Sequence, residues 1–209
     1  MIGQGVLREC LLAPDVQEVL AVGRSATGQT HPKLRELVRR DLADYAGAEG
    51  ELTGYDACFF CLGVSSSGLN EEEYRRVTYD IAVAAARTLS ARNPGMTFVF
   101  VSGAGTDPKS GTMWARVKGQ AEDAILALPF KAAYAFRPAF IRPMHGMTSR
   151  TAAYRLFYAL LGPLYPLIKA IFPAYVATTE QVGRAMLKAA REGAPKKILE
   201  NRDIAALGD

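Results

Sequence analysis

The chain has 209 residues, of which 49% are hydrophobic and 22% are charged, and its formal net charge at pH 7 is +4. This length suits one well-buried domain and excludes two domains of ordinary size. Lys and Arg are spread along the chain, which excludes a nucleic-acid partner, and three cysteines without a secretory leader predict a reducing, cytoplasmic setting without disulfides.

The first third of the chain predicts one helix followed by three strands. We expect a helix from Gly3 to Leu12, which ends before Pro14. A buried strand over residues 18–24 follows, and a short strand over 36–38 leads to Asp41. Residues 57–63 are apolar on both faces and end in glycine, which is typical of a central strand in a parallel sheet.

The rest of the chain continues this alternation of strands and helices. Helices are expected over 71–91, 114–127 and 179–191, and strands over 97–103 and 132–138. Such a rhythm predicts an α/β fold with one doubly wound, parallel, Rossmann-type sheet and helices on both faces. We expect a single domain over residues 1–209, in which residues 144–178 form an apolar insertion.

The first, central strand of that sheet is expected to be missing from this sequence. Met1–Leu7 match the third glycine, Gly3, and the first helical turn of a GxxGxxG dinucleotide loop. In a sheet of order 3-2-1-4-5-6, the strands around Val19 and Phe59 then lose their shared neighbour. Because each buried unpaired backbone group costs about 1 to 3 kcal/mol, we expect about ten further apolar residues, ending in Gly-x-x-Gly, before Met1. The alternative is a genuine fragment that rearranges, swaps or remains unstable.

Polar residues after the early strands indicate which cofactor is bound. Arg24 and Ser25 follow the strand at which NAD-preferring proteins place an acid for the ribose 2′-hydroxyl, and an arginine there suits a 2′-phosphate. NADP is therefore expected as the cofactor, with NAD as the alternative. Asp41 is expected to bond the adenine amino group. Arg24 is otherwise a solvated surface residue, and Asp41 otherwise a cap or turn residue.

The most specific pattern is a serine followed by an aromatic residue and a lysine. Ser102 ends the strand over 97–103, and Trp114 and Lys118 lie four residues apart, on one face of the next helix. They resemble the catalytic serine and the YxxxK motif of the short-chain dehydrogenase/reductase superfamily. The resemblance implies that Ser102 polarises the substrate oxygen and Lys118 fixes the ribose. Trp114 replaces the tyrosine, and because an indole N–H only donates, the proton relay is broken.

Further segments extend the resemblance over nearly the whole chain. Leu62 and Gly63 resemble the family's glycine turn, 137–143 its RPxxI segment, and 178–183 its late helix start. Together they resemble the atypical, epimerase-like NAD(P)H-binding branch that includes NmrA-like and Tat-interacting oxidoreductase-like proteins. The cofactor-binding residues that this implies are Gly3, Arg24, Ser25, Asp41, Leu62, Gly63, Lys118 and Pro138. The resemblance implies a bound dinucleotide but no particular reaction.

Two functions therefore remain open. The first is an NADP(H)-dependent reductase that transfers a hydride to a carbonyl of a small, apolar or bulky substrate. The second is a non-catalytic NADP(H)-sensing or protein-interaction module. The apolar insertion is expected to serve as a lid, as a homodimer surface, or as a helix at a membrane interface.

The remaining cysteines and histidines predict no metal site. Cys58 and Cys61 are three residues apart in a strand, so their side chains point to opposite faces and are expected in the core. His31 and His145 have no cysteine or carboxylate at a spacing that builds a zinc site. His145, close behind Arg142 and Pro143, is a candidate for lining the substrate pocket and is otherwise an ordinary loop histidine.

Overall fold

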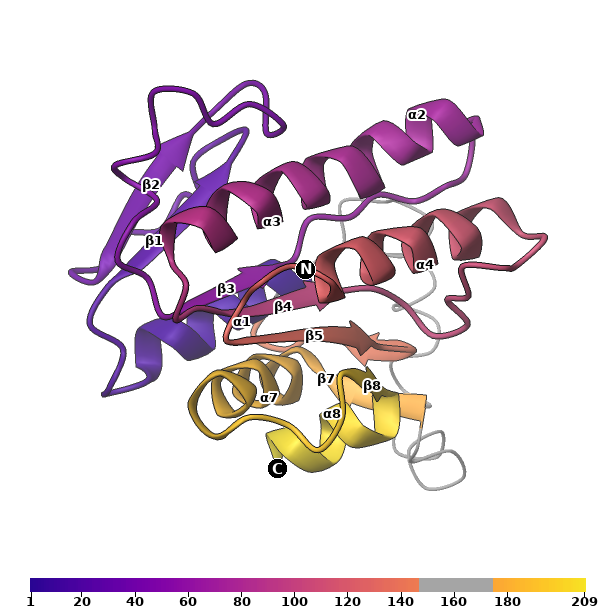
Figure 1. Ribbon diagram of the computed structural model, residues 1–209. Coiled ribbons are helices and arrows are strands. Elements are labelled where there is room, and N and C mark those ends of the chain that lie inside the picture. Colours follow the sequence, from indigo (N-terminus) through magenta and orange to yellow (C-terminus); the bar gives the residue numbers. More distant parts are fainter. Residues whose placement is uncertain (147–174) are drawn as a thin grey trace.

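The computed structural model describes residues 1–146 and 175–209. Its elements are α1 (Ile2–Leu12), β1 (Val19–Gly23), β2 (Leu34–Val38), β3 (Ala57–Phe60), α2 (Glu71–Arg75), η1 (Arg76–Asp80), α3 (Ile81–Arg92), β4 (Thr97–Val101), α4 (Met113–Leu126), β5 (Ala132–Arg137), β6 (Phe140–Arg142), β7 (Val176–Thr178), α7 (Thr179–Glu192), β8 (Ile198–Glu200) and α8 (Asn201–Gly208). Figure 1 shows a strand layer between α2, α3 and α4 above it and α1, α7 and α8 below it. The predicted α/β fold with helices on both faces is confirmed.

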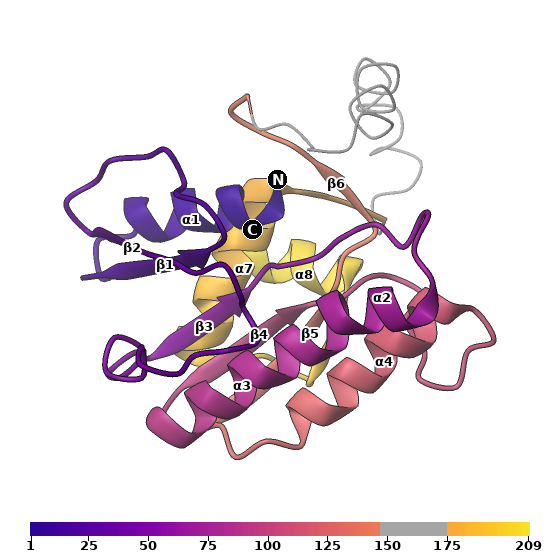
Figure 2. The same ribbon diagram turned by 90° about the horizontal axis from the view of Figure 1, so that it is seen from above.

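The strands form three parallel sheets. The largest has the order β3-β4-β5-β8, while β1 pairs only with β2, and β6 pairs only with β7. Within the described ranges, β1 and β3 therefore share no hydrogen-bonded neighbour. Figure 2 shows the β1–β2 pair beside β3, at the edge of the four-stranded sheet. A further, central strand was expected at this place, and this expectation stays a prediction.

The predicted helix over 71–91 is one rod with an irregular middle. It begins at a capping box in which the Asn70 side chain accepts from the Glu73 amide at 2.9 Å and the Glu73 carboxylate accepts from the Asn70 amide at 3.0 Å. A π-helical segment, η1, then joins α2 to α3. Among the described residues of this segment, Thr78 is buried and lies on the stretch that packs against α4.

The end of the chain differs from its prediction. Helix α7 was expected over 179–191 as the last element, but β8 and α8 follow it. Strands β6, β7 and β8 have three residues each, which is too short for a period-2 pattern to be recognised. Their place in the sheets is fixed by contacts far along the chain, such as the pairing of Phe136 with Leu199.

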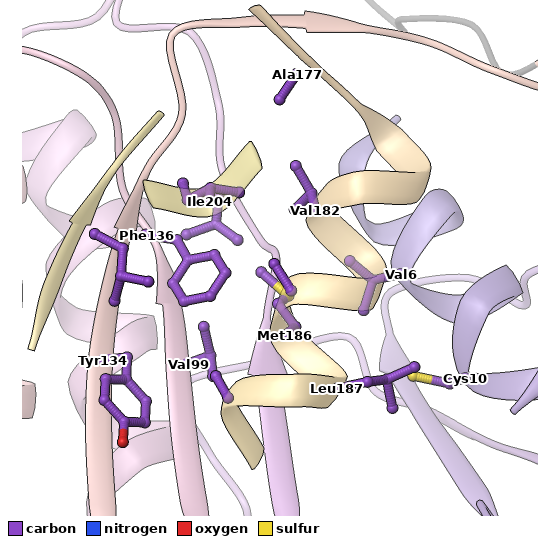
Figure 3. Packing of buried hydrophobic residues seen from close by; sticks show 14 of the residues in the cluster. Val6, Cys10, Val99, Tyr134, Phe136, Ala177, Val182, Met186, Leu187 and Ile204 are labelled. Atoms are coloured by element: carbon purple, nitrogen blue, oxygen red, sulfur yellow. The ribbon is translucent and has the colours of Figure 1, made fainter. Parts of the chain in front are cut away.

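Two apolar clusters occupy the two faces of the strand layer. One joins α1, α7 and α8 to the sheet, with Phe136, Met186 and Ile204 fully buried, and Figure 3 shows these side chains interlocking with Val6 and Val182. The other cluster packs α3 and α4 against Phe98 and Phe100. Its buried members are Leu52, Ala82, Val83, Ala86, Leu89, Met96, Phe98, Phe100, Ala121 and Ile125. The strand layer is thus covered by helices on both sides.

Helices α1 and α7 approach each other through glycines. A Cβ atom on Gly5 would lie 2.6 Å from the Thr179 Cβ, and one on Gly183 would lie 2.6 Å from the Glu9 Cγ. Only a missing side chain permits this distance. In the part of the chain that the structure describes, no helix is both long and apolar enough to cross a membrane. The predicted apolar insertion over 144–178 lies mostly outside the described residues.

Candidate active site at the carboxyl ends of the strands

The predicted site residues gather along one edge of the strand layer. Ser25 follows β1, Gly63 follows β3, Ser102 follows β4 and Pro138 follows β5. The amino ends of β1 and β3 lie near each other, because Glu18 before β1 accepts a hydrogen bond at 2.8 Å from the Tyr55 hydroxyl before β3. Ligands of open α/β sheets bind outside the carboxyl ends of the strands, so this edge is the candidate site.

Ser102 is held rigidly at the end of β4. Its side chain is buried, its amide donates to the Phe136 carbonyl at 2.7 Å, and its Oγ lies 3.0 Å from the Thr106 Oγ1. The Thr106 hydroxyl already donates its one hydrogen to the Gly103 carbonyl at 2.7 Å. Ser102 is therefore the donor of the pair. To polarise a substrate oxygen, Ser102 must turn its hydrogen away from Thr106.

The loop after Ser102 brings Trp114 to the same edge. The Ala104 amide donates to the Pro138 carbonyl at 3.0 Å, which ties this loop to the end of β5. Gly105 has a φ of +82°, and the Trp114 ring lies 3.6 Å from where a Cβ on Gly105 would be. Trp114, in the first turn of α4, thus borders the loop that begins at Ser102.

Lys118 lies one turn further along α4, against the end of the sheet. Its Nζ is 5.9 Å from the centroid of the Phe100 ring, two residues before Ser102. Burial lowers the pKa of Lys118 to about 8, and the Glu122 carboxylate opposes this shift. A lysine with this pKa gives up a proton near neutral pH far more readily than an exposed lysine does.

Lys118→Met is expected to raise Tm at pH 7 by about 2 to 4 °C. In a chain of this size, such a shift corresponds to a gain of ~1 kcal/mol in the free energy of unfolding. Because the folded pKa of about 8 lies below the ordinary 10.5, the unfolded chain binds more protons between these values, and stability rises with pH there. The difference between variant and wild type should therefore become smaller as the pH rises from 8 to 10. Thermal unfolding at pH 7, 8.5 and 10 measures it.

The exposed Lys109 provides the matched control. Lys109→Met should leave Tm within error of wild type at all three pH values. A Lys118→Met protein whose Tm difference does not change with pH contradicts the assignment of a depressed pKa to Lys118.

A buried ion pair supports this part of the site, and sequence reasoning missed it. Arg137 donates to the two carboxylate oxygens of Glu122 at 2.6 and 3.0 Å, and Glu122 is 1% exposed. A third bond, at 3.2 Å, joins Arg137 to Glu200. The spacing of four residues between Lys118 and Glu122 on α4 was a signal that could have pointed to this acid.

The other end of the edge presents the predicted nucleotide contacts. Arg24 and Ser25 are exposed directly after β1. Asp41 is exposed after β2, and its Oδ1 accepts from the Ala43 amide at 2.8 Å. The Asp41 carboxylate thus makes the turn that the sequence left open as the alternative to adenine binding. Its contact with adenine stays a prediction.

Gly3 lies where a glycine is needed. A Cβ on Gly3 would be 3.2 Å from the Cys61 Cβ, so the first turn of α1 packs closely against the end of β3. Close packing of helix on strand is the reason for the third glycine of a dinucleotide loop. In the turn after β3, Leu62 is half-buried and Gly63 is exposed.

The remaining candidates have structural partners. His145, with a φ of +54°, pairs through Nε2 with Glu180 at the start of α7, away from Ser102 in the sequence and on another loop. Cys58 packs with the α3 cluster and Cys61 with the α1 cluster, so they point to opposite faces as predicted. In the ranges 1–146 and 175–209, no three His, Cys, Asp or Glu side chains form a group that would hold a metal ion.

Curated relatives of this chain carry a name but no stated activity. No family model matches the sequence. The chain is 25% identical to "Protein fmp52, mitochondrial" of Emericella nidulans over 90% of its own length and 82% of that protein. It is 27% identical to "Protein FMP52, mitochondrial" of Meyerozyma guilliermondii over 97% of its own length and 84% of that protein. These names contradict the predicted cytoplasmic location. That prediction rested on composition and cysteine count, which carry no information about targeting to mitochondria.

Solved structures share the fold at low sequence identity. A short-chain dehydrogenase/reductase family oxidoreductase from Burkholderia thailandensis matches all of this chain and 89% of its own, with a TM-score of 0.68 and 16% identity. DesIV, a dTDP-glucose 4,6-dehydratase from Streptomyces venezuelae solved with NAD and TYD bound, matches 99% of this chain and 76% of its own, with a TM-score of 0.68 and 16% identity. A UDP-N-acetylglucosamine 4-epimerase from Methanobrevibacter ruminantium gives a TM-score of 0.66 at 14% identity, over 95% of this chain and 72% of its own.

Proposed function

We propose that the protein is a nicotinamide-dependent oxidoreductase of the atypical short-chain dehydrogenase/reductase kind, with NADP(H) as its cofactor and a carbonyl compound as its substrate. The observation that carries this proposal is the arrangement of Ser102, Trp114 and Lys118. Ser102 lies at the carboxyl end of β4, Trp114 borders the loop that follows it, and the Lys118 Nζ lies 5.9 Å from the centroid of the Phe100 ring in β4. DesIV, which shares this fold, was solved with NAD bound. We propose a mitochondrial setting on the names of the relatives.

The described residues suit the two ends of a nicotinamide dinucleotide. Arg24 and Ser25 would hold the adenosine 2′-phosphate, because both are exposed beyond β1 and the guanidinium pairs well with a phosphate. Lys118 would hold the ribose next to nicotinamide, and Gly3 gives the start of α1 its close approach to β3. The bound cofactor supplies or accepts the hydride.

The chain's own residues then handle the substrate oxygen. The Ser102 hydroxyl donates to that oxygen once it leaves Thr106, which stabilises negative charge as it develops there. Trp114 offers a flat apolar wall and one N–H donor, but no proton that can be transferred. The proton comes from Lys118 or from water, and the pKa of about 8 suits Lys118 to this step.

The sole tryptophan of the chain is a built-in probe for this function. We expect NADPH to quench Trp114 emission, because Trp114 borders the site. Carbonyl compounds of increasing apolar size should then oxidise NADPH, followed by absorbance at the nicotinamide band. In Trp114→Tyr, a phenol restores the proton donor, and turnover should rise by about 10²-fold. Trp114→Phe, which restores no donor, is the matched control and should not gain activity.

The cofactor preference is tested with the same titration. Arg24→Ala should weaken NADPH binding and leave NADH binding unchanged, while the exposed Arg40 beyond β2 serves as control. An unchanged NADPH/NADH affinity ratio in Arg24→Ala would show that the 2′-phosphate contact is wrongly assigned. If neither cofactor binds, the oxidoreductase proposal fails as well.

A second function is favoured by Trp114 itself. An aromatic residue that cannot transfer a proton, at the position of the acid, suits a module that binds NADP(H) and reports its redox state to a partner. Binding of NADPH without turnover, in both the wild-type protein and Trp114→Tyr, would support this module and contradict the reductase.

A further inference from the structure

The Lys118 amine lies at the edge of the strand layer without an ionic partner. In the ranges that the structure describes, its Nζ lies 5.9 Å from the centroid of the Phe100 ring and makes no hydrogen bond or ion pair. Lys118 is half-buried. Its Nζ keeps some contact with solvent, because the one fully enclosed side-chain polar atom without a partner in these ranges is the Thr78 Oγ1. A ligand can therefore reach this amine without displacing a carboxylate from it.

The acid that follows Lys118 by one helical turn is already paired. Glu122 accepts two hydrogen bonds from Arg137, at 2.6 and 3.0 Å, and both side chains of this pair are largely buried. The two bonds hold the carboxylate toward the end of β5, and the guanidinium balances its charge. The Lys118 ammonium therefore gains little from Glu122, and burial is the larger of the two effects on its pKa.

The surroundings of the amine are aromatic. Side chains alternate along β4, so that Phe100 packs in the cluster with α3 and α4, whereas Val99 packs in the cluster with α1 and α7. By the same alternation, Ser102 continues the Phe100 face, and Figure 1 shows α4 above the strand layer. Trp114 precedes Lys118 by one turn of α4, so the two side chains are neighbours on that helix. An aromatic ring of the sheet and one of the helix thus flank the amine.

This environment makes the Lys118 amine a good nucleophile. An amine attacks a carbonyl carbon in its neutral form. Because the pKa of Lys118 is about 8, about one in four of its amines is neutral at pH 7.5, against about one in a thousand for an ordinary lysine. Lysines that are desolvated in apolar pockets are suited to forming Schiff bases with carbonyl compounds.

We propose that Lys118 is a covalent binding site for aldehydes with an apolar chain, which it captures as an imine. The Nζ lone pair attacks the aldehyde carbon, and a C–N bond forms as the carbonyl π bond breaks. Both amine hydrogens then leave with the carbonyl oxygen as one water molecule, so the step requires no oxidant, reductant or cofactor. An aldehyde suits a half-buried amine better than a ketone does, because its carbonyl carbon bears a hydrogen and is less hindered. The aromatic neighbours favour an apolar chain over a charged one.

This capture goes beyond the proposed oxidoreduction and does not depend on it. One consequence does rest on the proposed function, because the same amine is assigned there to the ribose beside nicotinamide. An imine at Lys118 and a bound dinucleotide then exclude each other, so an aldehyde is captured while the dinucleotide is absent.

The test uses hexanal as an apolar aldehyde and glyoxylate as a charged one. The 209-residue chain is incubated with each at pH 7.5 together with cyanoborohydride, which adds a hydride to the imine carbon and leaves a stable secondary amine. Peptide mapping by mass spectrometry compares the labelling of Lys118 with that of the exposed Lys109. Hexanal should label Lys118 at least tenfold faster than Lys109. Glyoxylate should label Lys118 no faster than Lys109, because its carboxylate loses hydration beside aromatic side chains.

Two variants provide matched controls. Lys118→Arg keeps the positive charge but removes the amine, so the rapid labelling by hexanal should disappear, whereas Lys109→Arg should retain it. The comparison of the two lysines within the wild-type protein does not depend on the folding of either variant. Equal labelling of Lys118 and Lys109 by hexanal overturns the proposal, and preferential labelling of Lys118 by glyoxylate overturns its assignment to apolar aldehydes.

The oxidised dinucleotide separates this proposal from the oxidoreductase. NADP⁺ at saturating concentration, added before hexanal, should slow the labelling of Lys118 at least tenfold and leave that of Lys109 unchanged. Rapid labelling of Lys118 that NADP⁺ does not slow would support the covalent site and contradict only the contact between Lys118 and the ribose.

Discussion

Glu122→Leu is expected to lower the free energy of unfolding by about 3 kcal/mol, because it leaves the Arg137 guanidinium without its main partner. This value is at the low end of the range for breaking a buried pair, since Arg137 keeps its bond to Glu200 and is 15% exposed. Loss of the Glu122 charge also removes the effect that raises the pKa of Lys118, so this pKa should fall further below 8. Urea unfolding and the pH dependence of Tm measure the two effects.

Two variants test whether the loss comes from the unpaired charge. Glu72→Gln removes an exposed partner of Arg76, 3.9 Å away, and should change stability by less than about 0.5 kcal/mol. Adding Arg137→Met to Glu122→Leu should recover most of the lost stability, because two apolar side chains then replace the pair. A double variant as unstable as Glu122→Leu would contradict this account.

Gly119→Ala is expected to lower the free energy of unfolding by about 2 to 3 kcal/mol, within the range for inserting atoms into a packed interior. Its Cβ would lie 2.3 Å from the Pro108 nitrogen, so α4 and the loop after Ser102 cannot keep their present distance. The higher helix propensity of alanine, worth about 1 kcal/mol, offsets only part of this strain. Since Trp114 lies on the same helix, its emission spectrum should shift as well.

Gly95→Ala is the matched control. No atom lies within 4 Å of a Cβ on Gly95, and its φ is not in the left-handed region. This variant should keep wild-type stability to within about 0.5 kcal/mol and leave the Trp114 spectrum unchanged. A Gly119→Ala protein as stable as the Gly95→Ala protein would show that the loop moves away at little cost.

The longer elements were predictable because their hydrophobic periodicity agrees with the glycine and proline residues that mark their ends. Strand β4 was expected over 97–103 and runs to Val101, and α4 was expected from Trp114 and begins at Met113. Hydrophobic residues on both faces of 57–63 identified β3 as an interior strand. The candidate residues Ser102, Trp114 and Lys118 lie at fixed offsets from such elements, so their positions after β4 and in α4 agree with the sequence, while their function stays a prediction.

Contacts distant in sequence account for what was missed. Strand β8 exists because Leu199 pairs with Phe136, and nothing in three residues signals that pairing. The Glu122–Arg137 bond forms because α4 packs close to the end of β5, and no local sequence pattern shows that these two elements are neighbours. The role of Asp41 was undecided for a similar reason, because a turn and a ligand can use the same carboxylate and only its turn bond with the Ala43 amide is a local feature.

The separate β1–β2 pair has a consequence for how the molecule unfolds. Two-stranded sheets are marginal by themselves, and this one shares no backbone hydrogen bonds with the four-stranded sheet in the described part of the chain. Its opening therefore breaks none of the ladder that holds β3, β4, β5 and β8 together. The β1–β2 pair is therefore expected to open more readily than the four-stranded sheet, and Arg24 directly follows β1. If Arg24 binds the 2′-phosphate as proposed, any contact that holds β1 against its neighbours also strengthens this binding.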